Sequence, residues 1–311
     1  MTETNHRDKL YTTAIKASVE AGKVILEYYY DSYSIEYKTD NSPLTLADKK
    51  AHNCIAGYLE ETNLPVLSEE GNKIPYEERK NWREFWMVDP LDGTKEFINK
   101  NGEFTVNIAL IRDGLPIMGV VYVPVTGILY FGSEEYGSYR IDTNIYDRSE
   151  KSALSAQHSV GSYDENAHAS KHDADKDLNH LSTLHDFLSK AEKLPLNPSN
   201  RSVTIVGSRS HQNPANNEII KSFSSNFETV NMLNVGSSLK FCKIAEGTAD
   251  FYPRLGPTME WDTAAGHAVC KFAGAKVYIY KTRDEVIYNK PDLLNPYFVV
   301  VNLQFQKYLE I

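Results

Sequence analysis

The 311-residue sequence contains only three cysteines, Cys54, Cys242 and Cys270, and their spacing is not that of a zinc or iron–sulfur site. Each lies in an apolar segment of helical pattern, so we predict reduced core residues. The sequence also lacks an apolar run of membrane-spanning length, and its polar start, MTETNHRDKL, lacks the apolar region of a signal peptide. We therefore expect a cytoplasmic protein without a transmembrane segment, and peripheral attachment to the inner membrane stays open.

An excess of positive charge is absent as well, since the formal net charge is −9. Binding a nucleic acid polymer requires a basic surface, so we exclude such polymers as partners. A small phosphorylated ligand is not excluded, because a bound cation or a local Lys/Arg pair can make one pocket positive. The composition, with 41% hydrophobic and 24% charged residues, is that of an ordinary soluble globular protein.

The first 142 residues predict helices followed by an antiparallel sheet. Apolar residues recur at three- and four-residue steps over 7–30 and 45–61, which is the helical period. Two short apolar runs, VLSEE and FWMVDP, then end in acidic residues. Residues 104–135 are rich in β-branched and aromatic residues and contain turn signals at Asp113-Gly114 and Thr126-Gly127, so they predict an antiparallel meander.

Residues 143–200 differ from the rest, because they are rich in Ser, Asp, Asn and Lys and poor in large apolar residues before Leu178. They contain five histidines, which would suit a metal-binding tract, but no strict spacing recurs. We therefore predict a polar, mobile insertion with little core and one short helix near 178–192. The histidines of this stretch are His158, His168, His172, His180 and His185.

From residue 201 strands and helices alternate, with helices near 214–224 and 259–273 and strands such as SVTIVGS, DFYPR and AKVYIY. This alternation predicts an α/β half in which helices cover a sheet. The expected fold class is therefore layered α/β, with an antiparallel N-terminal sheet and a C-terminal α/β half. We divide the chain into an N-terminal half (1–142), the insertion (143–200) and a C-terminal half (201–311).

Acidic residues end several of the apolar segments, where α/β proteins place ligand-binding side chains. Each has an ordinary explanation of its own. Asp92 could cap a helix, Asp262 could be an acid in the first turn of a helix, where the helix dipole favours it, and Glu69 could be an exposed loop residue. Together, however, they are hard oxygen donors without an accompanying Cys or His set, which suits Mg²⁺ better than Zn²⁺. The acids are Asp48, Glu69, Glu70, Asp89, Asp92 and Asp262.

The stretch DPLDGT suggests how these acids could act. Asp89 and the Leu91 carbonyl can ligate one metal ion while Asp92 reaches a second, and Pro90 stiffens the turn. Gly93 begins the following helix, whose free N–H groups could bind a phosphate. Two Mg²⁺ ions about 4 Å apart can bind both oxygens of an in-line phosphoryl displacement.

Several motifs together resemble a known family. NSPLTLAD, VLSEE, VDPLDGTKEF, NGEFTVNIALI, GVVYVPV, GSSLKFCKIAEG, YPRLGPT and WDTAAGHAV occur in the order found in the lithium-sensitive, magnesium-dependent phosphatases of the inositol monophosphatase and fructose-1,6-bisphosphatase superfamily. Within it the chain resembles the bacterial 3′(2′),5′-bisphosphate nucleotidases. The resemblance covers nearly all of the chain except about residues 143–200.

The resemblance implies a role for each acid. Glu69, Asp89 and the Leu91 carbonyl would hold one Mg²⁺, and Asp89, Asp92 and Asp262 would hold the second; two or three ions are expected per site. Asp48 and Thr94 match the pair that orients and deprotonates the attacking water, because a threonine hydroxyl needs a carboxylate behind it to accept a proton. Glu70 matches an acid that holds a metal-bound water.

The resemblance also implies substrate contacts. Gly93 and Thr94 would bind the phosphate that is hydrolysed, and Ser237 and Lys240 in GSSLK would bind a second phosphate. Arg254 in YPRLG could pair with the 5′-phosphate or stack on the base. His211 matches a position that touches the nucleotide, although a loop histidine that caps the next helix is nearly as plausible.

The implied activity is hydrolysis of the 3′-phosphate of 3′-phosphoadenosine 5′-phosphate, with 3′-phosphoadenylyl sulfate as a second substrate. An inositol monophosphatase is the nearest alternative, and a non-catalytic, nucleotide-sensing regulator is a second one. The sequence leaves the oligomeric state open between monomer and homodimer.

Overall fold

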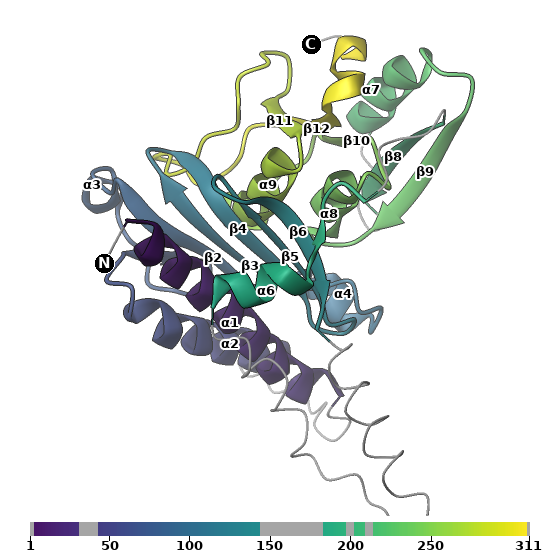
Figure 1. Cartoon of the computed structure of the whole chain (residues 1–311). Helices are drawn as coiled ribbons and strands as arrows, with labels where there is room; N and C mark the ends of the chain where they lie inside the picture. The colour runs from purple at the N-terminus through teal and green to yellow at the C-terminus, as the bar shows by residue number, and fades with distance from the viewer. Residues whose placement is uncertain (1–2, 31–42, 144–182, 197–201, 209–213, 310–311) are drawn as a thin grey trace, which may run out of the picture.

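The computed structural model describes residues 3–30, 43–143, 183–196, 202–208 and 214–309 (Figure 1). The N-terminal part contains α1 (Glu3–Tyr30), α2 (Pro43–Glu60), β1 (Val66–Ser68), α3 (Tyr76–Arg79), β2 (Glu84–Asp92), α4 (Thr94–Ile98), β3 (Thr105–Arg112), β4 (Leu115–Val123), β5 (Ile128–Ser133), β6 (Gly137–Asp142), α6 (Leu184–Lys190) and β7 (Glu192–Lys193). The C-terminal part contains β8 (Val203–Ser208), α7 (Pro214–Ser224), β9 (Val230–Val235), α8 (Leu239–Glu246), β10 (Phe251–Arg254), α9 (Glu260–Phe272), β11 (Ala275–Ile279), β12 (Phe298–Asn302) and the 3₁₀ helix η1 (Leu303–Tyr308).

The elements form five layers, because each sheet buries both of its faces. Helices α1 and α2 pack on one face of the first sheet, and α8 and α9 lie between the two sheets (Figure 1). Helices α7 and η1 cover the outer face of the second sheet. Alternate residues of β2 reach opposite cores, with Trp86 on the α1/α2 side and Met87 on the α8/α9 side, as the two-residue period of a strand requires.

The first sheet has seven strands in the order β1 to β7. The predicted meander is confirmed, since β3, β4 and β5 pair antiparallel. Asp113 and Gly114 both have positive φ at the β3–β4 turn, which that hairpin requires. The prediction of a wholly antiparallel sheet was wrong at one edge, where β1 pairs parallel to β2 and α3 connects the two strands.

The second sheet is mixed, with the order β11-β12-β10-β8-β9. Strand β8 pairs parallel with β9 and β10, whereas β12 pairs antiparallel with β10 and β11. The sequence analysis had not identified β6, β7 or β12. Strand β12 is an almost fully buried apolar run next to β10, and its position places β10 in the middle of the sheet.

Helix α9 joins the two sheets because it packs very closely on the first one. A Cβ at Gly119 would lie 2.4 Å from the Ala265 carbonyl oxygen, and one at Gly132 would lie 2.8 Å from the Val269 Cα. Both glycines therefore allow the helix backbone to approach the sheet. The predicted boundary near residue 200 separates two sheets, but one core contains side chains from both.

Part of the stretch 143–200 is described and packs on the first sheet. Helix α6 matches the short helix expected near 178–192, and Thr183 and Asp186 form a capping box at its start. Leu184, Phe187 and Leu194 are buried, so the prediction of little core was wrong for this part. His185 lies in α6, and the other four histidines lie outside the described residues.

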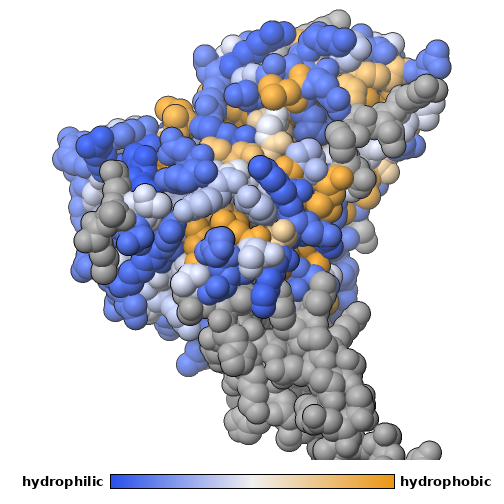
Figure 2. Space-filling view, in the orientation of Figure 1, coloured by the Kyte–Doolittle hydropathy of each residue, from blue (hydrophilic) through white to orange (hydrophobic). Residues whose placement is uncertain are grey.

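Two further predictions were that the cysteines are reduced core residues and that the chain has no transmembrane segment. Cys242 and Cys270 are buried, Cys54 is partly buried, and all three are free thiols. The face of the molecule seen in Figure 2 is mostly hydrophilic, with separate, smaller hydrophobic areas. None of the described helices has both the length and the apolar character needed to cross a lipid bilayer.

Candidate active site

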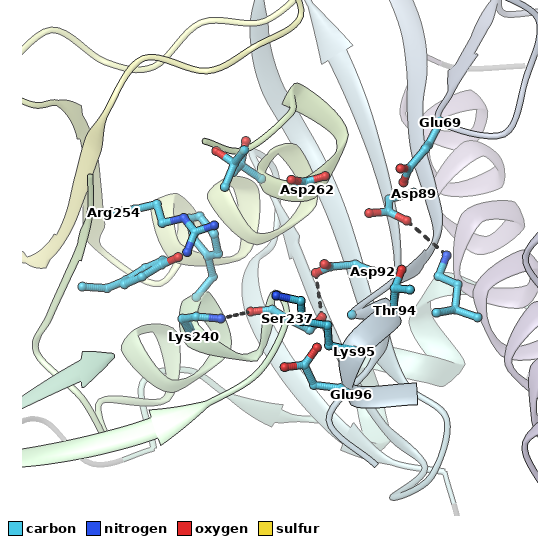
Figure 3. A pocket seen from close by; sticks show the side chains of 16 residues that line it. Glu69, Asp89, Asp92, Thr94, Lys95, Glu96, Ser237, Lys240, Arg254 and Asp262 are labelled. Atoms are coloured by element: carbon cyan, nitrogen blue, oxygen red, sulfur yellow. Dashed lines mark hydrogen bonds between the residues drawn. The ribbon is translucent and has the colours of Figure 1, made fainter. Parts of the chain in front are cut away.

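A pocket of about 290 Å³ lies where the end of β2 and α4 face α8, β10 and the start of α9 (Figure 3). Glu69, Asp89 and Asp262 lie at one end of it and Lys240 and Arg254 at the other, and Lys95 and Glu96 also belong to its wall (Figure 3). It collects ten of the residues that the sequence analysis selected: Glu69, Asp89, Leu91, Asp92, Gly93, Thr94, Ser237, Lys240, Arg254 and Asp262.

The end of β2 leaves the regular ladder at the DPLD segment. Asp89 pairs with Asn107 and Asp92 with Thr105, so the register shifts between the two aspartates. Pro90 has no N–H to donate to a ladder, which explains the irregularity. The Leu91 N–H donates instead to Asp89 Oδ1 at 3.1 Å. This local turn places both aspartates on the pocket wall.

Three carboxylates converge at the acidic end. Glu69, Asp89 and Asp262 each offer an oxygen, and these atoms lie within 4.8 Å of one another. Asp89 is only 2% exposed, and burial followed by the charges of Asp92, Glu69 and Asp262 raises its pKa well above the usual range. Burial and then Asp92 raise the pKa of Asp262 to about 7. The three groups thus repel one another when all are ionised.

The donor set of these carboxylates fits a hard divalent cation. It consists of oxygens alone, and in the part of the chain that the structure describes no lysine or arginine forms an ion pair with any of the three. Bringing several carboxylates together without a counter-charge is costly, and a divalent cation would remove that cost. The structure groups Glu69 with Asp262, whereas the resemblance assigns them to different ions that share Asp89.

Asp92 has a structural role that sequence reasoning missed. Its Oδ2 accepts hydrogen bonds from the Ser237 hydroxyl (2.6 Å) and the Ser238 N–H (2.7 Å), with longer contacts to Thr105 and Asn107. Asp92 therefore fixes the loop before α8 against the end of β2. Its Oδ1 has no donor among the described residues, and Asp92 lines the pocket.

The loop before α8 fits closely against the N-terminal half at two further points. Gly236 has no space for a side chain, because a Cβ there would lie 2.5 Å from Glu96 Cγ. Its N–H donates to Glu103 Oε2 at 2.8 Å. Ser237 has a positive φ of 51°, a strained conformation for a residue other than glycine. These contacts set the position of Lys240 relative to the acids.

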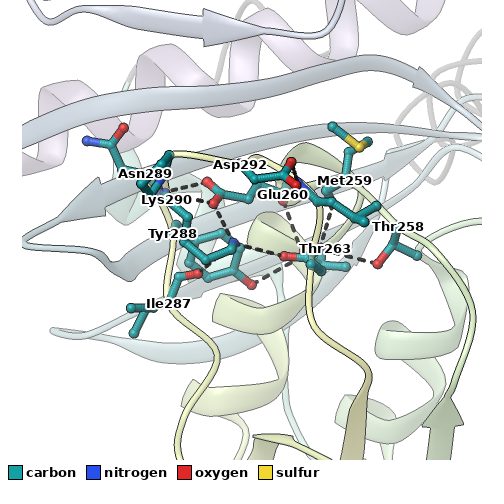
Figure 4. A network of polar contacts seen from close by, with 12 residues as sticks. Thr258, Met259, Glu260, Thr263, Ile287, Tyr288, Asn289, Lys290 and Asp292 are labelled. Carbon is teal, nitrogen blue, oxygen red and sulfur yellow. Dashed lines mark hydrogen bonds and ion pairs between the residues drawn. The ribbon is translucent and has the colours of Figure 1, made fainter. Parts of the chain in front are cut away.

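The start of α9 is held by the loop 287–295 (Figure 4). The fully buried Glu260 carboxylate accepts from the N–H groups of Asn289 (2.5 Å) and Lys290 (2.9 Å) and from Lys290 Nζ (2.5 Å). Asn295 is also buried, and its Nδ2 donates to the Met259 carbonyl oxygen at 2.7 Å. The first turn of α9 is thus fixed on the side away from the pocket.

That anchoring determines where Asp262 lies. Asp262 is the third residue of α9, and its Oδ2 accepts from the Met259 N–H at 2.9 Å, which caps the helix. Its other oxygen has no donor among the described residues. Asp262 is therefore an acid in the first turn of the helix, as the sequence allowed, and it adds a hydrogen bond to the helix start and a place in the carboxylate group.

The basic end of the pocket is formed by Lys240 and Arg254. Lys240 is 5% exposed, and its Nζ donates to the Ser237 carbonyl oxygen at 2.9 Å. Burial is the main cause that lowers the Lys240 pKa to about 8, against the opposing influence of Asp92. Arg254 donates to the Pro257 carbonyl oxygen at 3.0 Å, and its Nε is buried without a partner. An anionic ligand would provide both cations with a counter-charge.

Comparisons with known proteins agree with this geometry. A model of the inositol monophosphatase family matches residues 6–309. The chain belongs to the inositol monophosphatase family. It is 37% identical over 284 residues to the 3′(2′),5′-bisphosphate nucleotidase CysQ of Salmonella typhimurium (strain LT2), covering 90% of this chain and 94% of that protein. CysQ of Escherichia coli (strain K12) gives the same identity and coverage.

Solved structures of the family have the same fold. The crystal structure of CysQ from Bacteroides thetaiotaomicron, a bacterial member of the inositol monophosphatase family, is 43% identical with a TM-score of 0.79 and covers 97% of this chain and 98% of that chain. Inositol monophosphatase II from Staphylococcus aureus is 22% identical with a TM-score of 0.65, covering 96% and 91%, which shows a shared fold alone. The prediction of an inositol monophosphatase-like α/β fold is confirmed. Since this is a family of metal-dependent phosphatases, the group of Glu69, Asp89 and Asp262 is where the described chain could hold an ion.

The pair expected to activate water in this family is not joined directly. Neither Asp48 nor Glu70 lines the pocket, and no hydrogen bond connects Asp48 to Thr94 among the described residues. Asp48 nevertheless lies near enough to the acids to interact with them. Burial raises its pKa to about 8, and the charges of Glu70 and Glu69 add to this effect. Its Oδ1 is enclosed without a partner. The roles of Asp48, Thr94 and Glu70 stay predictions.

The helix predicted after DPLDGT is the short helix α4. It has five residues, so its dipole adds little to phosphate binding, and Gly93 precedes it with φ of 100°. The positive charge at the pocket comes from side chains instead. His211, expected at the nucleotide, lies outside the described residues, and its role stays a prediction.

Several residues of the pocket wall were not predicted: Lys95, Glu96, Phe241, Tyr252, Thr258 and Thr263. Tyr252 could have been found, because it precedes Arg254 by two residues in a strand and therefore lies on the same face. Lys95 and Glu96 directly follow the DPLDGT motif. Thr258 precedes α9, and Thr263 directly follows Asp262 in its first turn. Nothing in the sequence around these two threonines indicated that they line a pocket.

Proposed function

We propose that this protein is a Mg²⁺-dependent 3′(2′),5′-bisphosphate nucleotidase that hydrolyses 3′-phosphoadenosine 5′-phosphate to AMP and phosphate. We propose 3′-phosphoadenylyl sulfate as a second substrate, and a role in sulfur assimilation and in removal of the bisphosphate. One observation carries the proposal: a single pocket has a carboxylate group at one end and Lys240 with Arg254 at the other. The names of the CysQ relatives support it.

The separation of charges within the pocket suits a substrate with two phosphates. The acidic end can bind a phosphate only through cations, and the basic end can bind a second phosphate directly. An inositol monophosphate has one phosphate, so it would leave Lys240 and Arg254 without a counter-charge. A nucleotide-sensing regulator would not need the carboxylate group, because unused buried carboxylates only destabilise a fold.

For the cofactor we propose two or three Mg²⁺ ions. Glu69, Asp89 and the Leu91 carbonyl would hold one ion, and Asp89, Asp92 and Asp262 a second. When bound, the ions supply positive charge to the phosphate oxygens and lower the pKa of a bound water. The convergence of Glu69, Asp89 and Asp262 supports this set, as does the second oxygen of Asp92, which has no donor among the described residues.

The remaining residues would orient the substrate and the water. Thr94, which lines the pocket, would orient the attacking water, and the enclosed Asp48 would accept its proton through the threonine hydroxyl. Glu70 would hold a second water. Gly93, Ser237, Lys240, Arg254 and His211 would contact the nucleotide. The proposed partner is therefore a small molecule rather than a nucleic acid polymer, in a cytoplasmic monomer or homodimer.

A substrate panel tests the proposal. Phosphate release is measured with 3′-phosphoadenosine 5′-phosphate, 3′-phosphoadenylyl sulfate, 3′-AMP and inositol 1-phosphate, each with Mg²⁺ and with chelator. We expect the bisphosphate nucleotide to have the highest kcat/KM and the chelator to abolish release. A preference for inositol 1-phosphate would make the protein an inositol monophosphatase, and no release from any substrate would favour the regulator.

A further inference from the structure

Tyr252 is a buried tyrosine whose ring is fixed at the pocket wall. It is 4% exposed and lies in β10, the central strand of the second sheet. Its ring meets Phe241 edge-on at 5.5 Å between centroids and Phe298 edge-on at 5.8 Å. With only 4% of the residue exposed, the ring offers little surface on which a base could stack. What Tyr252 can offer to a ligand is its hydroxyl.

The hydroxyl of Tyr252 has no hydrogen-bond partner among the described residues, although its side chain lines the pocket. Other buried tyrosines in the chain have partners: Tyr11 donates to Glu135 (2.5 Å), Tyr130 donates to Glu246 (2.6 Å), and Tyr288 pairs with His267 (3.0 Å). A buried hydroxyl without a partner is costly, so such groups are normally satisfied. The Tyr252 oxygen is also not among the fully enclosed atoms, which means that it reaches the pocket.

Two cations line the pocket together with Tyr252. The Lys240 Nζ lies 5.9 Å from the centroid of the Tyr252 ring. Arg254 follows Tyr252 by two residues in β10, so both side chains project from the same face of the sheet, and both line the pocket. A ligand group between two cations and a neutral O–H donor is an anion with several acceptor oxygens, and a phosphate has that chemistry.

We infer that the Tyr252 hydroxyl donates a hydrogen bond to the phosphate that is not hydrolysed, and so helps the pocket select bisphosphorylated nucleotides. This inference rests on the proposed function and deepens it. A phosphate monoester presents three terminal oxygens, of which Lys240 and Arg254 can each bind one. Tyr252 provides a third, fixed donor without adding another charge to a pocket that already contains two cations.

The state of the hydroxyl supports this role. Burial raises the pKa of Tyr252 to about 12, against the opposing effect of Arg254. The hydroxyl therefore stays protonated, and able to donate, at pH values where Lys240 loses its charge. Selection through Tyr252 should consequently persist in alkaline solution.

The test compares Tyr252→Phe with the wild type on two substrates that differ by one phosphate. The substitution removes the hydroxyl and keeps the ring contacts with Phe241 and Phe298. Hydrolysis of 3′-phosphoadenosine 5′-phosphate should show a KM roughly ten- to a hundredfold higher, the usual effect of losing a hydrogen bond to a charged group, with little change in kcat. Hydrolysis of 3′-AMP, which has the same scissile phosphate and lacks the second one, should keep its KM.

Tyr11→Phe is the matched control, because Tyr11 is also buried and its hydroxyl donates to Glu135 in the turn between β5 and β6. It should lower the melting temperature and leave the ratio of the two KM values unchanged. Tyr252→Phe should melt close to the wild type, since its hydroxyl has no partner to lose. Equal effects of Tyr252→Phe on both substrates, no effect on either, or loss of folding would each overturn the inference. A wild type that does not prefer the bisphosphate over 3′-AMP would overturn the proposed function instead.

Discussion

Raising the pH above 8 should weaken the binding of 3′-phosphoadenosine 5′-phosphate selectively, because Lys240 loses its proton there. Burial lowers the pKa of this lysine to about 8, from an ordinary value of 10.5. The ammonium is therefore charged below that pH and neutral above it. The phosphate of the substrate is already a dianion in this range, since its second pKa is about 6.

The size of the effect follows from the fraction of charged lysine. At about one pH unit above the pKa, roughly a tenth of the free enzyme has a charged Lys240, so the apparent affinity should fall about tenfold. The fall should stop at roughly ten- to a hundredfold, because a charge-assisted contact contributes about 1.5–3 kcal/mol.

The assay takes the ratio of the KM values for the bisphosphate and for 3′-AMP between about pH 7 and pH 9.5. Titration of the carboxylate group affects the KM of both substrates, so its effect cancels in the ratio. The ratio then reports only how binding of the second phosphate changes with pH. In Lys240→Arg the ratio should be constant over this range, because a guanidinium keeps its charge. A wild-type ratio that does not change with pH would refute the assignment of Lys240 to the second phosphate.

Two other substitutions test the acidic end. Asp89→Asn should lose most of the turnover at saturating Mg²⁺, and near-native phosphate release would contradict its role as a ligand. Without metal, the same variant should unfold at an equal or higher temperature at neutral pH. The pKa of Asp89 is raised in the folded protein, so its ionisation destabilises the fold at pH values above the ordinary carboxyl pKa. Glu260→Gln should lower the free energy of unfolding, measured by urea denaturation, by up to about 3 kcal/mol. The substitution leaves the Lys290 ammonium without its buried, negatively charged partner. It should also weaken Mg²⁺ binding in calorimetry by displacing Asp262, and unchanged Mg²⁺ affinity would show that Glu260 does not position that ligand.

Much of the acidic end could be predicted from the sequence because its signals are local. Asp89 follows a buried apolar run, Glu69 ends a second one, and Asp262 begins a helical pattern, so all three lie at the ends of elements. Their shared chemistry then pointed to one cation site. The period of two residues in FYPR likewise contained the information that places Tyr252 beside Arg254.

What could not be predicted depends on contacts between distant parts of the chain. Asp92 bonds Ser237 and Ser238, which follow it by about 145 residues, and no local pattern indicates such pairing. The sharing of one core by the two sheets depends on Gly119, whose role becomes visible only when α9 lies against it. The parallel pairing of β1 was missed because its three residues are too few to show a direction.

The measurement that tests the central claim most directly is the effect of Lys240→Ala and Arg254→Ala on two substrates. Both residues line the pocket at the end away from the carboxylates, so the site of hydrolysis should stay intact. We predict that each variant raises the KM for 3′-phosphoadenosine 5′-phosphate roughly ten- to a hundredfold, while hydrolysis of 3′-AMP and of inositol 1-phosphate hardly changes. Equal losses on all three substrates would contradict the claim that this pocket has a separate site for a second phosphate.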